Sequence, residues 1–596
     1  MRSAKTVLNV IRDRGKRGLP LDDIYRQLFN PSLYLLAYGR IYRNDGAMTK
    51  GATEETVDGM SLEKIGNIIE LLRYERYRWT PVRRTEIPKK NGKTRPLGIP
   101  TWSDKLLQEV IRLILEAYYE PQFSDSSHGF RPQRGCHTAL QTVQHTWKGT
   151  KWFIEGDIRG CFDNIDHEIM MSILRERIED NRFLRLMKNL LEAGYLEQWD
   201  YKPTLSGVPQ GGIVSPILTN IYLDRLDKYV EQTLIPEYTR GDRRGYGSDY
   251  TRLVKRASYL RKVGRFEKAL ELRKQYQRMP SKNVNDPGYR RLRYVRYADD
   301  FLLGFIGSAD EAREIKDKLE MFMRDNLNME LSGEKTLITH ARTHAAKFLG
   351  YEVIVQHEDS KHTNGRRSIN GYIGLRVPES FIRERCARYM RKGKVIHRLE
   401  LVNCSNYAIV YDYQSKYRGY VQYYKLAVNL SWLNRVHWIM QTSLFKTLAC
   451  KHKSSVSKMA RKYVKTVRFP HGLRRCVEVI VVRKDKKPLI ARFGGLSRKR
   501  EDYAVIADRQ IDNDRAPRCE LLTRLLADRC EICGATSKVE VHHVRALKDL
   551  KVKGKKEKPL WMQTMSALKR KTLIVCRQCH RAIHSGKPLI KPKDTS

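Results

Sequence analysis

The sequence lacks any apolar run near the ~18 residues that a membrane span needs, so a membrane protein is not expected. Its start, MRSAKTVLNVIRDRGKRGLP, also lacks the apolar core of a secretory signal. That stretch is basic, as organellar transit peptides are, but Asp13, Asp22 and Asp23 argue against one. No internal repeat or low-complexity tract is evident. These absences favour a cytoplasmic protein, with an organellar origin left open.

Cysteine is scarce and does not show the spacing of a disulfide framework. Of the 11 cysteines, seven are scattered and four form two C-x-x-C pairs near the C-terminus. In an intracellular protein this spacing is more typical of a metal site than of disulfides. The sequence therefore predicts a bound metal in its C-terminal segment.

Acidic residues are too few to balance the basic ones. The 596 residues include 114 Lys and Arg but only 67 Asp and Glu, which gives a net charge of +47. Such a charge repels itself unless a polyanion neutralises it, so nucleic acid is the expected partner. Hydrophobic residues make up 41% of the chain, enough to build cores. Its length predicts several packed units.

The sequence does contain a pair of adjacent carboxylates between two apolar runs. In RYVRYADDFLLGF (293–305) both flanks are typical of strands, so Asp299 and Asp300 are expected at the tip of a tight hairpin. A divalent cation would remove their mutual repulsion. Asp157, which ends the predicted strand KWFIEGDI, is the best candidate for a third carboxylate. Three carboxylates holding two Mg²⁺ ions suit phosphoryl transfer. The alternative is a solvated turn, where Asp is common.

Six further segments surround this pair in a fixed order. The whole series is IPKKNGKTRPLGIPTWSDKLLQ, SSHGFRPQRGCHTAL, EGDIRGCFDNIDH, SGVPQGGIVSPILTNIYL, YADD, LSGEKTLIT and KFLGYEV. This order resembles that of reverse transcriptases, in particular the group II intron-encoded proteins, over nearly the whole chain. The resemblance implies an α+β fold with right-hand reverse transcriptase fingers and palm, a helical thumb (maturase domain X), a DNA-binding segment and a ββα-metal HNH zinc module.

The resemblance also implies roles in the polymerase site. Asp157, Asp299 and Asp300 match the catalytic triad that binds two Mg²⁺ ions. Nucleotide-binding roles fall on Lys89 and Arg95 for the triphosphate, and on Phe162 and Gln210 for the sugar. A ring at Phe162 would clash with a 2′-hydroxyl and favour deoxynucleotides. The alternative for this residue is an ordinary core aromatic.

Two acidic residues near this site are expected to be structural. Asp163 fits a turn, and Asp166 fits the N-cap of a helix that begins HEIMMSILRERI. Residues 240–293 resemble a basic helical insertion, with 17 Lys and Arg against 5 Asp and Glu.

The region after about residue 377 is helical and rich in tyrosine and basic residues. Four tyrosines fall on one helical face, for which we favour a packing role: Tyr413, Tyr417, Tyr420 and Tyr424. Stacking on RNA bases, aided by Arg418 and Lys425, is the alternative. In the resembled family this region is the thumb that grips intron RNA. The run KHKSSVSKMARKYVKTVRFPHGLRR (451–475) then matches the family's DNA-binding segment in position and charge, although a solvated face would look the same.

The C-terminal segment contains CEICGATSKVEVHHV and LIVCRQCHRAIH. Zinc-ribbon spacing predicts one structural Zn²⁺ site at Cys530, Cys533, Cys576 and Cys579. Four histidines remain, and their pattern resembles an HNH nuclease. That resemblance implies that His543 is the general base, and that one divalent ion is held by His542, His580 and His584. Lys571 stands where many HNH proteins have an asparagine. A zinc knuckle that only binds nucleic acid is the alternative.

Together these features predict a multifunctional mobile-intron protein. It would bind its intron RNA and assist splicing. It would then cut the bottom strand of target double-stranded DNA, and copy RNA into DNA from dNTPs. The alternatives are a reverse transcriptase of another element, a splicing-only maturase and a plain nuclease. The sequence does not indicate an oligomeric state. The expected domains are 1–80 (N-terminal extension and fingers), 81–375 (fingers and palm), 376–450 (thumb), 451–515 (DNA-binding) and 516–596 (HNH).

Overall fold

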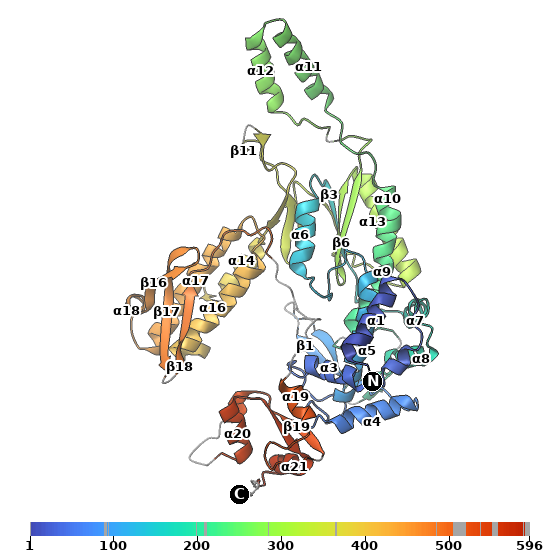
Figure 1. The fold of residues 1–596 in the computed structure, drawn as a ribbon. Helices are drawn as coiled ribbons and strands as arrows, with labels where there is room; N and C mark the ends of the chain where they lie inside the picture. The colour runs from blue at the N-terminus through green and yellow to red at the C-terminus, as the bar shows by residue number, and fades with distance from the viewer. Residues whose placement is uncertain are drawn as a thin grey trace.

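The computed structural model describes residues 2–88, 92, 94–197, 200–204, 206–207, 211–283, 285–363, 366–483, 486–504, 520–536, 538–550, 558–587 and 589. Figure 1 shows N-terminal helices beside a central sheet, a projecting helical arm, a thumb with its own small sheet, and a C-terminal module. Within the described residues, no helix has the length and apolar character that a membrane crossing requires. The polar stretch DNDRAPR (512–518), whose composition is typical of a linker, lies outside the described residues.

The N-terminal segment is a layer of helices. Its main helices begin where a side-chain oxygen accepts a backbone N–H, at Ser3, Asn30, Ser61 and Thr101. Their apolar faces pack into one core that continues beneath the central sheet. The helices are α1 (Ala4–Lys16), α2 (Ile24–Gln27), α3 (Pro31–Ile41), α4 (Leu62–Arg73) and α5 (Trp102–Tyr119). The next helix, α6 (Cys136–Thr146), packs instead into the core shared with the thumb.

The fingers carry a four-stranded sheet of order β2-β1-β4-β5. Gly92 lies between its first two strands with a φ of 79°, a backbone conformation that favours glycine. The strands are β1 (Val82–Pro88), β2 (Thr94–Ile99), β4 (Tyr195–Glu197) and β5 (Asp200–Lys202).

The palm is an antiparallel sheet of order β6-β7-β3-β8 that separates two hydrophobic cores. Along β7, Phe301 and Leu303 enter the core shared with the N-terminal helices, whereas Leu302 enters the core shared with the thumb. This alternation follows from the two-residue period of a strand. The strands are β3 (Trp152–Asp157), β6 (Arg291–Tyr297), β7 (Asp300–Ile306) and β8 (Ile338–His340), with helices α7 (His167–Arg175), α8 (Asn181–Leu191), α9 (Ser215–Tyr229) and α13 (Ala309–Leu327) around them.

The basic insertion forms a helical hairpin that projects from the palm (Figure 1). A short π-helical turn (Val230–Leu234) and α10 (Ile235–Glu237) lead into α11 (Ser248–Lys262) and α12 (Phe266–Gln277). Within these two long helices only Ala257 and Ala269 are buried. The arm therefore offers most of its charged surface to solvent or to a polyanion.

The thumb packs its helices against a three-stranded sheet in a single core. Tyr413, Tyr417 and Tyr424 are at most 3% exposed, so the packing role favoured for the tyrosine stripe is confirmed for these three. The segment 451–515, expected to bind DNA, contributes strands that pack against α16 in the same core. The elements are β9 (Ala346–Phe348), β10 (Tyr351–Val355), β11 (His362–Thr363), β12 (Arg366–Arg367), β13 (Ile373–Arg376), α14 (Glu379–Ala387), β14 (Met390–Arg391), β15 (Lys394–Val395), α15 (Leu399–Val402), α16 (Asn406–Tyr423), α17 (Leu433–Lys451), α18 (Val456–Tyr463), β16 (Val464–Phe469), β17 (Gly472–Arg483) and β18 (Lys486–Gly494).

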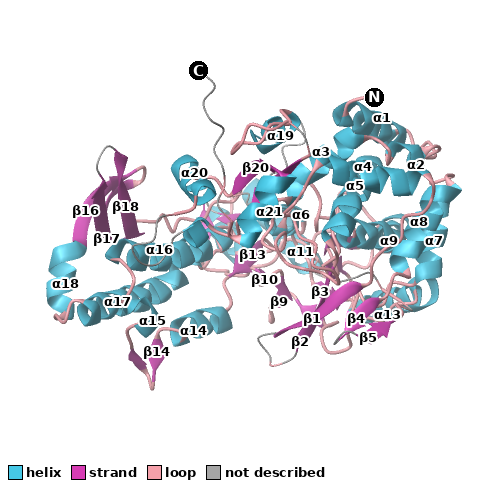
Figure 2. Ribbon diagram, turned by 90° about the horizontal axis from the view of Figure 1, so that it is seen from below, coloured by secondary structure: helices cyan, strands magenta, loops and turns pink. Residues whose placement is uncertain are grey.

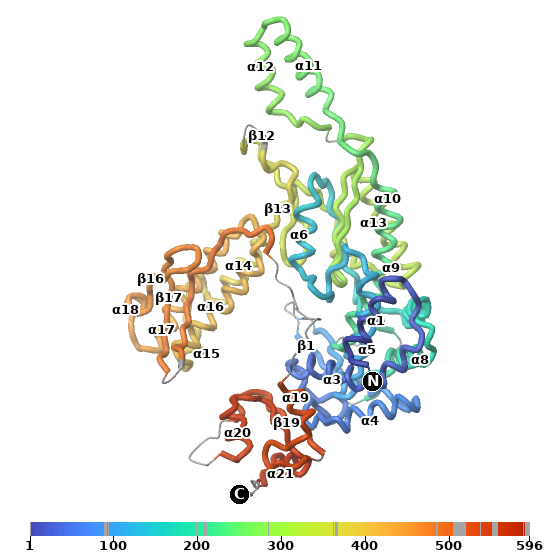
Figure 3. The backbone as a smooth tube through the Cα atoms, viewed as in Figure 1, coloured from blue at the N-terminus to red at the C-terminus, as the bar shows by residue number. Residues whose placement is uncertain are grey.

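The C-terminal module is a two-stranded sheet followed by a helix, and it lies against the N-terminal helices (Figures 2 and 3). Val541 and Ile574, which pair across the strands, enter the N-terminal core, whereas Leu573 and Val575 enter the module's own small core. The elements are α19 (Glu520–Leu526), β19 (Val539–His543), α20 (Leu560–Leu568), β20 (Thr572–Cys576) and α21 (Arg577–Ser585).

Candidate active sites

The expected carboxylates meet at one end of the palm sheet. Asp299 lies in the turn between β6 and β7, and Asp300 is the first residue of β7, paired with Tyr297. Asp157 ends the neighbouring strand β3 directly opposite Asp300. The preceding Ala298 has a φ of 56°, which gives the hairpin its tight tip. Two strand ends and one turn therefore bring together three residues that are far apart in the sequence.

The electrostatics of this tip favour a bound cation. Burial, followed by the charges of Asp299 and Asp157, raises the pKa of Asp300 to about 7. Burial also raises the pKa of Asp299, although the charges of Arg95 and Lys335 oppose the shift. Lys335 Nζ donates to Asp157 Oδ2 at 2.7 Å. Clustered carboxylates that resist ionisation suit hard divalent ions such as Mg²⁺, which can neutralise them together.

A buried ion pair supports the turn between β6 and β7 that carries the carboxylates. Arg296 and Asp227 are both fully buried, and Arg296 Nε donates to Asp227 Oδ1 at 2.8 Å. Arg296 Nη1 also donates to the carbonyl of Ala298 at 2.9 Å, just before the carboxylate pair. Gly129 supports the same turn, because a Cβ there would lie 2.3 Å from the backbone nitrogen of Ala298. The tip is thus held by backbone contacts that larger side chains would disturb.

Two of the expected nucleotide-binding residues are described and two are not. Arg95 is exposed on β2 and close enough to lower the pKa of Asp299. Phe162 is half-buried, with its ring 6.3 Å from that of Phe130 in an edge-to-face arrangement. The loop before α9 reaches this position, because a Cβ on Gly207 would lie 2.8 Å from the carbonyl oxygen of Phe162.

Lys89 and Gln210 lie outside the described residues. Of the two residues expected to be structural, Asp166 is the N-cap of α7, and its side chain accepts from the N–H of Ile169. Asp163 sits in the turn before it, with its N–H donating to the carbonyl of Gly160.

The cysteines form a compact cluster in the C-terminal module. Their sulfur atoms all lie within 4.8 Å of one another, in the set Cys530, Cys533, Cys576 and Cys579. Cys576 ends β20 and caps α21, so one residue ties the strand to the helix. Four thiolates at this spacing fit a tetrahedral structural Zn²⁺.

The histidines divide between the two faces of β19, as the alternation of a strand predicts. His542 faces α21, where its ring centroid is 5.3 Å from His580 and 5.4 Å from His584. His580 and His584 are one helical turn apart, with their Nε2 atoms 3.2 Å from each other. His580 Nδ1 is 2.7 Å from Glu540 Oε2, so the other ring nitrogen is aimed at the cluster. Both ring nitrogens of His542 are buried, and within the described part of the chain neither forms a hydrogen bond of good geometry. These donors fit a divalent ion.

His543 lies on the opposite face, against the N-terminal helices. Its Nε2 is 2.9 Å from the hydroxyl of Tyr38, and its ring also contacts Tyr42. Burial lowers its pKa to about 3, with the Asp58 charge opposing and His542 and His580 assisting. The imidazole is therefore neutral near physiological pH, which is the state that a general base requires.

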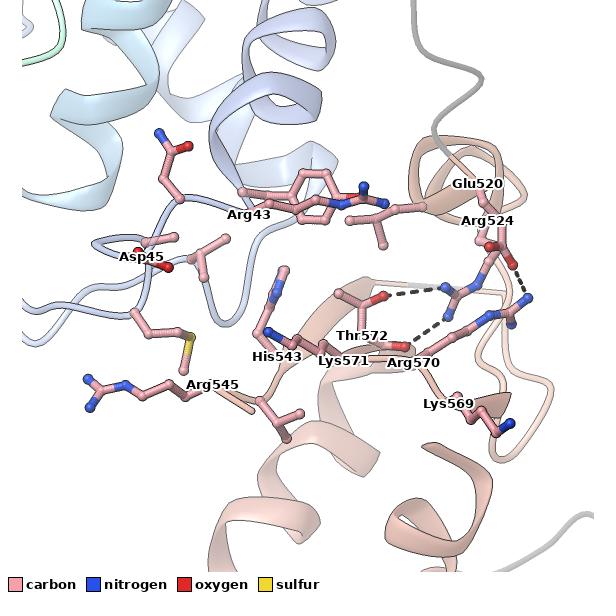
Figure 4. Close-up of a pocket in the computed structure, with 17 residues that line it drawn as sticks. Arg43, Asp45, Glu520, Arg524, His543, Arg545, Lys569, Arg570, Lys571 and Thr572 are labelled. Atoms are coloured by element: carbon pink, nitrogen blue, oxygen red, sulfur yellow. Dashed lines mark hydrogen bonds and ion pairs between the residues drawn. The ribbon is translucent and has the colours of Figure 1, made fainter. Parts of the chain in front are cut away.

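A cavity of about 580 Å³ opens beside His543, between the module and the N-terminal segment. Figure 4 shows His543 and Lys571 side by side on its wall, with Arg545 at one end. The lining is strongly basic and includes Arg43, Arg524, Arg545, Lys569, Arg570 and Lys571. A wall of this charge suits a phosphodiester backbone.

Sequence reasoning missed several residues of these sites. Asp58, from the segment before α4, lies within the histidine cluster, and nothing in its local sequence indicates this. The sequence around Tyr38 likewise gives no indication of its contact with His543. The position of Glu540 could have been predicted, because it is two residues before His542 and therefore lies on the same face of the strand. Lys335 lies in the LSGEKTLIT segment, whose contact with the carboxylates was not anticipated.

Comparison with known proteins gives three family-model matches. A reverse transcriptase (RNA-dependent DNA polymerase) model matches residues 87–353, a type II intron maturase model matches 380–496, and an AI2M/AI1M-like HNH endonuclease model matches 530–580.

Individual proteins also match over most of the chain. The group II intron-encoded protein LtrA of Lactococcus lactis is 40% identical, covering 95% of this chain and 96% of that protein. An uncharacterized 91 kDa protein in a cob intron of Schizosaccharomyces pombe is 34% identical, covering 98% of this chain and 73% of that protein. A solved telomerase structure from Candida albicans aligns at a TM-score of 0.35 with 14% identity, over 65% of this chain and 58% of that one. That last likeness is too low to support an argument.

Proposed function

The chain belongs to the group II intron-encoded proteins, the family of LtrA, and we propose that its activities are divided among the sites described above. It combines reverse transcriptase, maturase and HNH endonuclease domains, so it is both an RNA-directed DNA polymerase and a DNA endonuclease. It uses divalent metal and binds intron RNA and DNA. We retain the domain division 1–80, 81–375, 376–450, 451–515 and 516–596 as part of the proposal.

The polymerase site is assigned to the palm tip. Asp157, Asp299 and Asp300 would hold two Mg²⁺ ions, which when bound assist attack by the 3′-hydroxyl and stabilise the leaving pyrophosphate. Arg95 and Lys89 bind the triphosphate, and Gln210 lies near the sugar. Phe162 excludes a 2′-hydroxyl by its bulk. The observation that carries this assignment is the convergence of three carboxylates at one end of a strand pair.

RNA binding is assigned to the thumb and to the basic arm. The arm's helices are almost entirely exposed, and residues 240–293 have a local charge of 17 − 5 = +12. Charge of this density binds phosphates without reading sequence. We propose that the RNA held here is the intron that encodes the protein, and that binding assists its folding and splicing.

The nuclease site is assigned to the ββα module. His543 accepts a proton from water, and its position on the wall of the basic cavity supports that role. His542, His580 and His584 would hold one divalent ion, which when bound stabilises charge on the scissile phosphate. The four cysteines hold a structural Zn²⁺. The basic cavity beside His543 accommodates the DNA backbone. After cleavage, the cut strand supplies the 3′ end that the polymerase extends.

Two single substitutions test this division of labour. Asp299→Asn should abolish primer extension on an RNA template, with at least about a hundredfold loss, while RNA binding and DNA nicking persist. His543→Ala should abolish bottom-strand nicking by the reconstituted RNA–protein particle, by about 10²–10⁴-fold as for a lost general base, while splicing and primer extension persist. Asp310→Asn, an exposed residue on α13, controls for charge.

Each outcome bears on one assignment. Primer extension at the wild-type rate by Asp299→Asn would remove the polymerase assignment. Normal nicking by His543→Ala would leave the module as a zinc knuckle that only binds nucleic acid.

A further inference from the structure

One carboxylate in the nuclease cluster comes from the other end of the chain. Asp58 Oδ2 is 2.8 Å from His584 Nε2, and its Oδ1 is 3.3 Å from His542 Nδ1 and from His580 Nε2. Its ligand atom and those of the three histidines all lie within 4.8 Å of one another. Asp58 is only 14% exposed, so the contact is enclosed and not a surface encounter.

Backbone pairing, and not side-chain reach alone, sets the position of Asp58. The N–H of Gly59 donates to the carbonyl of Val541 at 3.0 Å, and the N–H of Val541 donates to the carbonyl of Met60 at 2.9 Å. The backbone N–H of His543 donates to Asp58 Oδ1 at 2.7 Å, across 485 positions of sequence. Residues 59–60 thus extend the edge of β19 and deliver the carboxylate beside the histidines.

The donor chemistry is that of a metal site. The Nε2 atoms of His580 and His584 face each other at 3.2 Å. Among the described residues, neither nitrogen of His542 forms a hydrogen bond of good geometry, although its Nδ1 lies 3.3 Å from Asp58 Oδ1. Glu540 orients His580 from behind, as carboxylates do for metal-binding histidines. A carboxylate inserted among such nitrogens supplies both an oxygen donor and a compensating negative charge.

Resting on the proposed nuclease function, we propose that Asp58 is a fourth protein ligand of the nuclease's divalent ion. The site is then completed only when the C-terminal module is docked on the N-terminal segment. Three imidazoles and one carboxylate suit a borderline transition metal ion. An octahedral ion would keep two positions for phosphate and water, whereas a tetrahedral Zn²⁺ would be closed.

Metal affinity tests the proposal independently of nuclease activity. The zinc-loaded full-length chain is titrated with Ni²⁺ by calorimetry, because Ni²⁺ favours imidazole donors over the all-carboxylate polymerase site. Asp58→Asn should weaken Ni²⁺ binding by at least about tenfold, since even residues behind a ligand contribute that much. His580→Ala should weaken it at least as far. Glu63→Gln removes the ion pair to Arg577 at 2.7 Å without touching the cluster, so it should leave affinity unchanged.

Two further measurements make the outcomes distinct. Hydrogen exchange at the Val541 amide shows whether each variant remains docked, and nicking by the RNA–protein particle should fall in Asp58→Asn. If Asp58→Asn keeps wild-type affinity while His580→Ala loses it, the inference is wrong and the proposed function survives. If neither substitution changes affinity, the histidine site itself is wrong. If Asp58→Asn nicks faster than wild type with unchanged affinity, Asp58 blocks the site instead of completing it.

Discussion

Removing Arg296 should disable the polymerase without touching any proposed ligand. Arg296 and Asp227 are both fully buried, and their side chains share two hydrogen bonds, at 2.5 and 2.8 Å. Among the described residues, the hydroxyl of Tyr294, at 2.8 Å, is the remaining hydrogen-bond donor to the Asp227 side chain in Arg296→Met. A buried charge that loses its partner typically costs about 3–5 kcal/mol. The lost donor to the Ala298 carbonyl adds about 1 kcal/mol at the tip itself.

The double variant Arg296→Met/Asp227→Leu separates charge burial from tip support. Replacing both members of a buried pair by apolar residues is often nearly neutral for stability. The double variant should therefore recover most of the stability that Arg296→Met loses. It should not recover primer extension, because the carbonyl of Ala298 still lacks its donor.

Backbone hydrogen exchange in β6 and β7 is the appropriate assay, since a chain with several packed units does not unfold in one step. A cost of about 3–5 kcal/mol corresponds to a hundredfold to several-thousandfold faster exchange of the Val295 and Leu302 amides. Primer extension is measured on the same samples. Wild-type protection in Arg296→Met, or a double variant no more protected than the single one, would refute the reasoning.

Two further predictions concern the same site. Divalent metal binding to the palm tip should weaken by up to tenfold per pH unit as pH falls below about 7. Burial and the neighbouring carboxylates raise the pKa of Asp300 to about 7, so below that pH a proton competes with the metal. Mn²⁺ titrations at several pH values measure this dependence, and a pH-independent affinity contradicts it. Phe162→Ala should raise ribonucleotide incorporation relative to deoxynucleotide incorporation by about tenfold, equivalent to ~1.4 kcal/mol, and an unchanged ratio would show that the ring acts elsewhere.

The palm tip could be predicted because its signals are local. Two apolar flanks around ADD define a hairpin, and Asp157 ends a strand with the same character. The antiparallel register then has to bring strand ends together, as the pairing of Asp157 with Asp300 illustrates. The separation of His542 from His543 followed from strand alternation in the same way.

Asp58 and Tyr38 could not be predicted, because their roles depend on docking between distant segments. Neither belongs to a periodic pattern or a spaced motif that refers to the C-terminal module. Asp58 is placed by the pairing of residues 59–60 with Val541, and Tyr38 by the packing of α3 against the module. The loop-closure entropy of such a pairing grows only slowly with the number of residues between the two segments. Distant segments can therefore pair without any local sequence feature that identifies the partner.

The sequence of strand β20 nevertheless indicates that another segment covers its second face. All five residues of TLIVC are buried, and its continuous apolar run differs from the alternation of a sheet with one wet face. The module supplies cover for one face only, with Leu573 and Val575 in its own core. Ile574 and its neighbour Val541 are covered by the N-terminal helices instead. A two-stranded sheet is marginal alone, so the nuclease and the first helices form one packed unit. Domain boundaries drawn along the sequence separate residues that share a core, and the proposed Asp58 ligand lies at that shared interface.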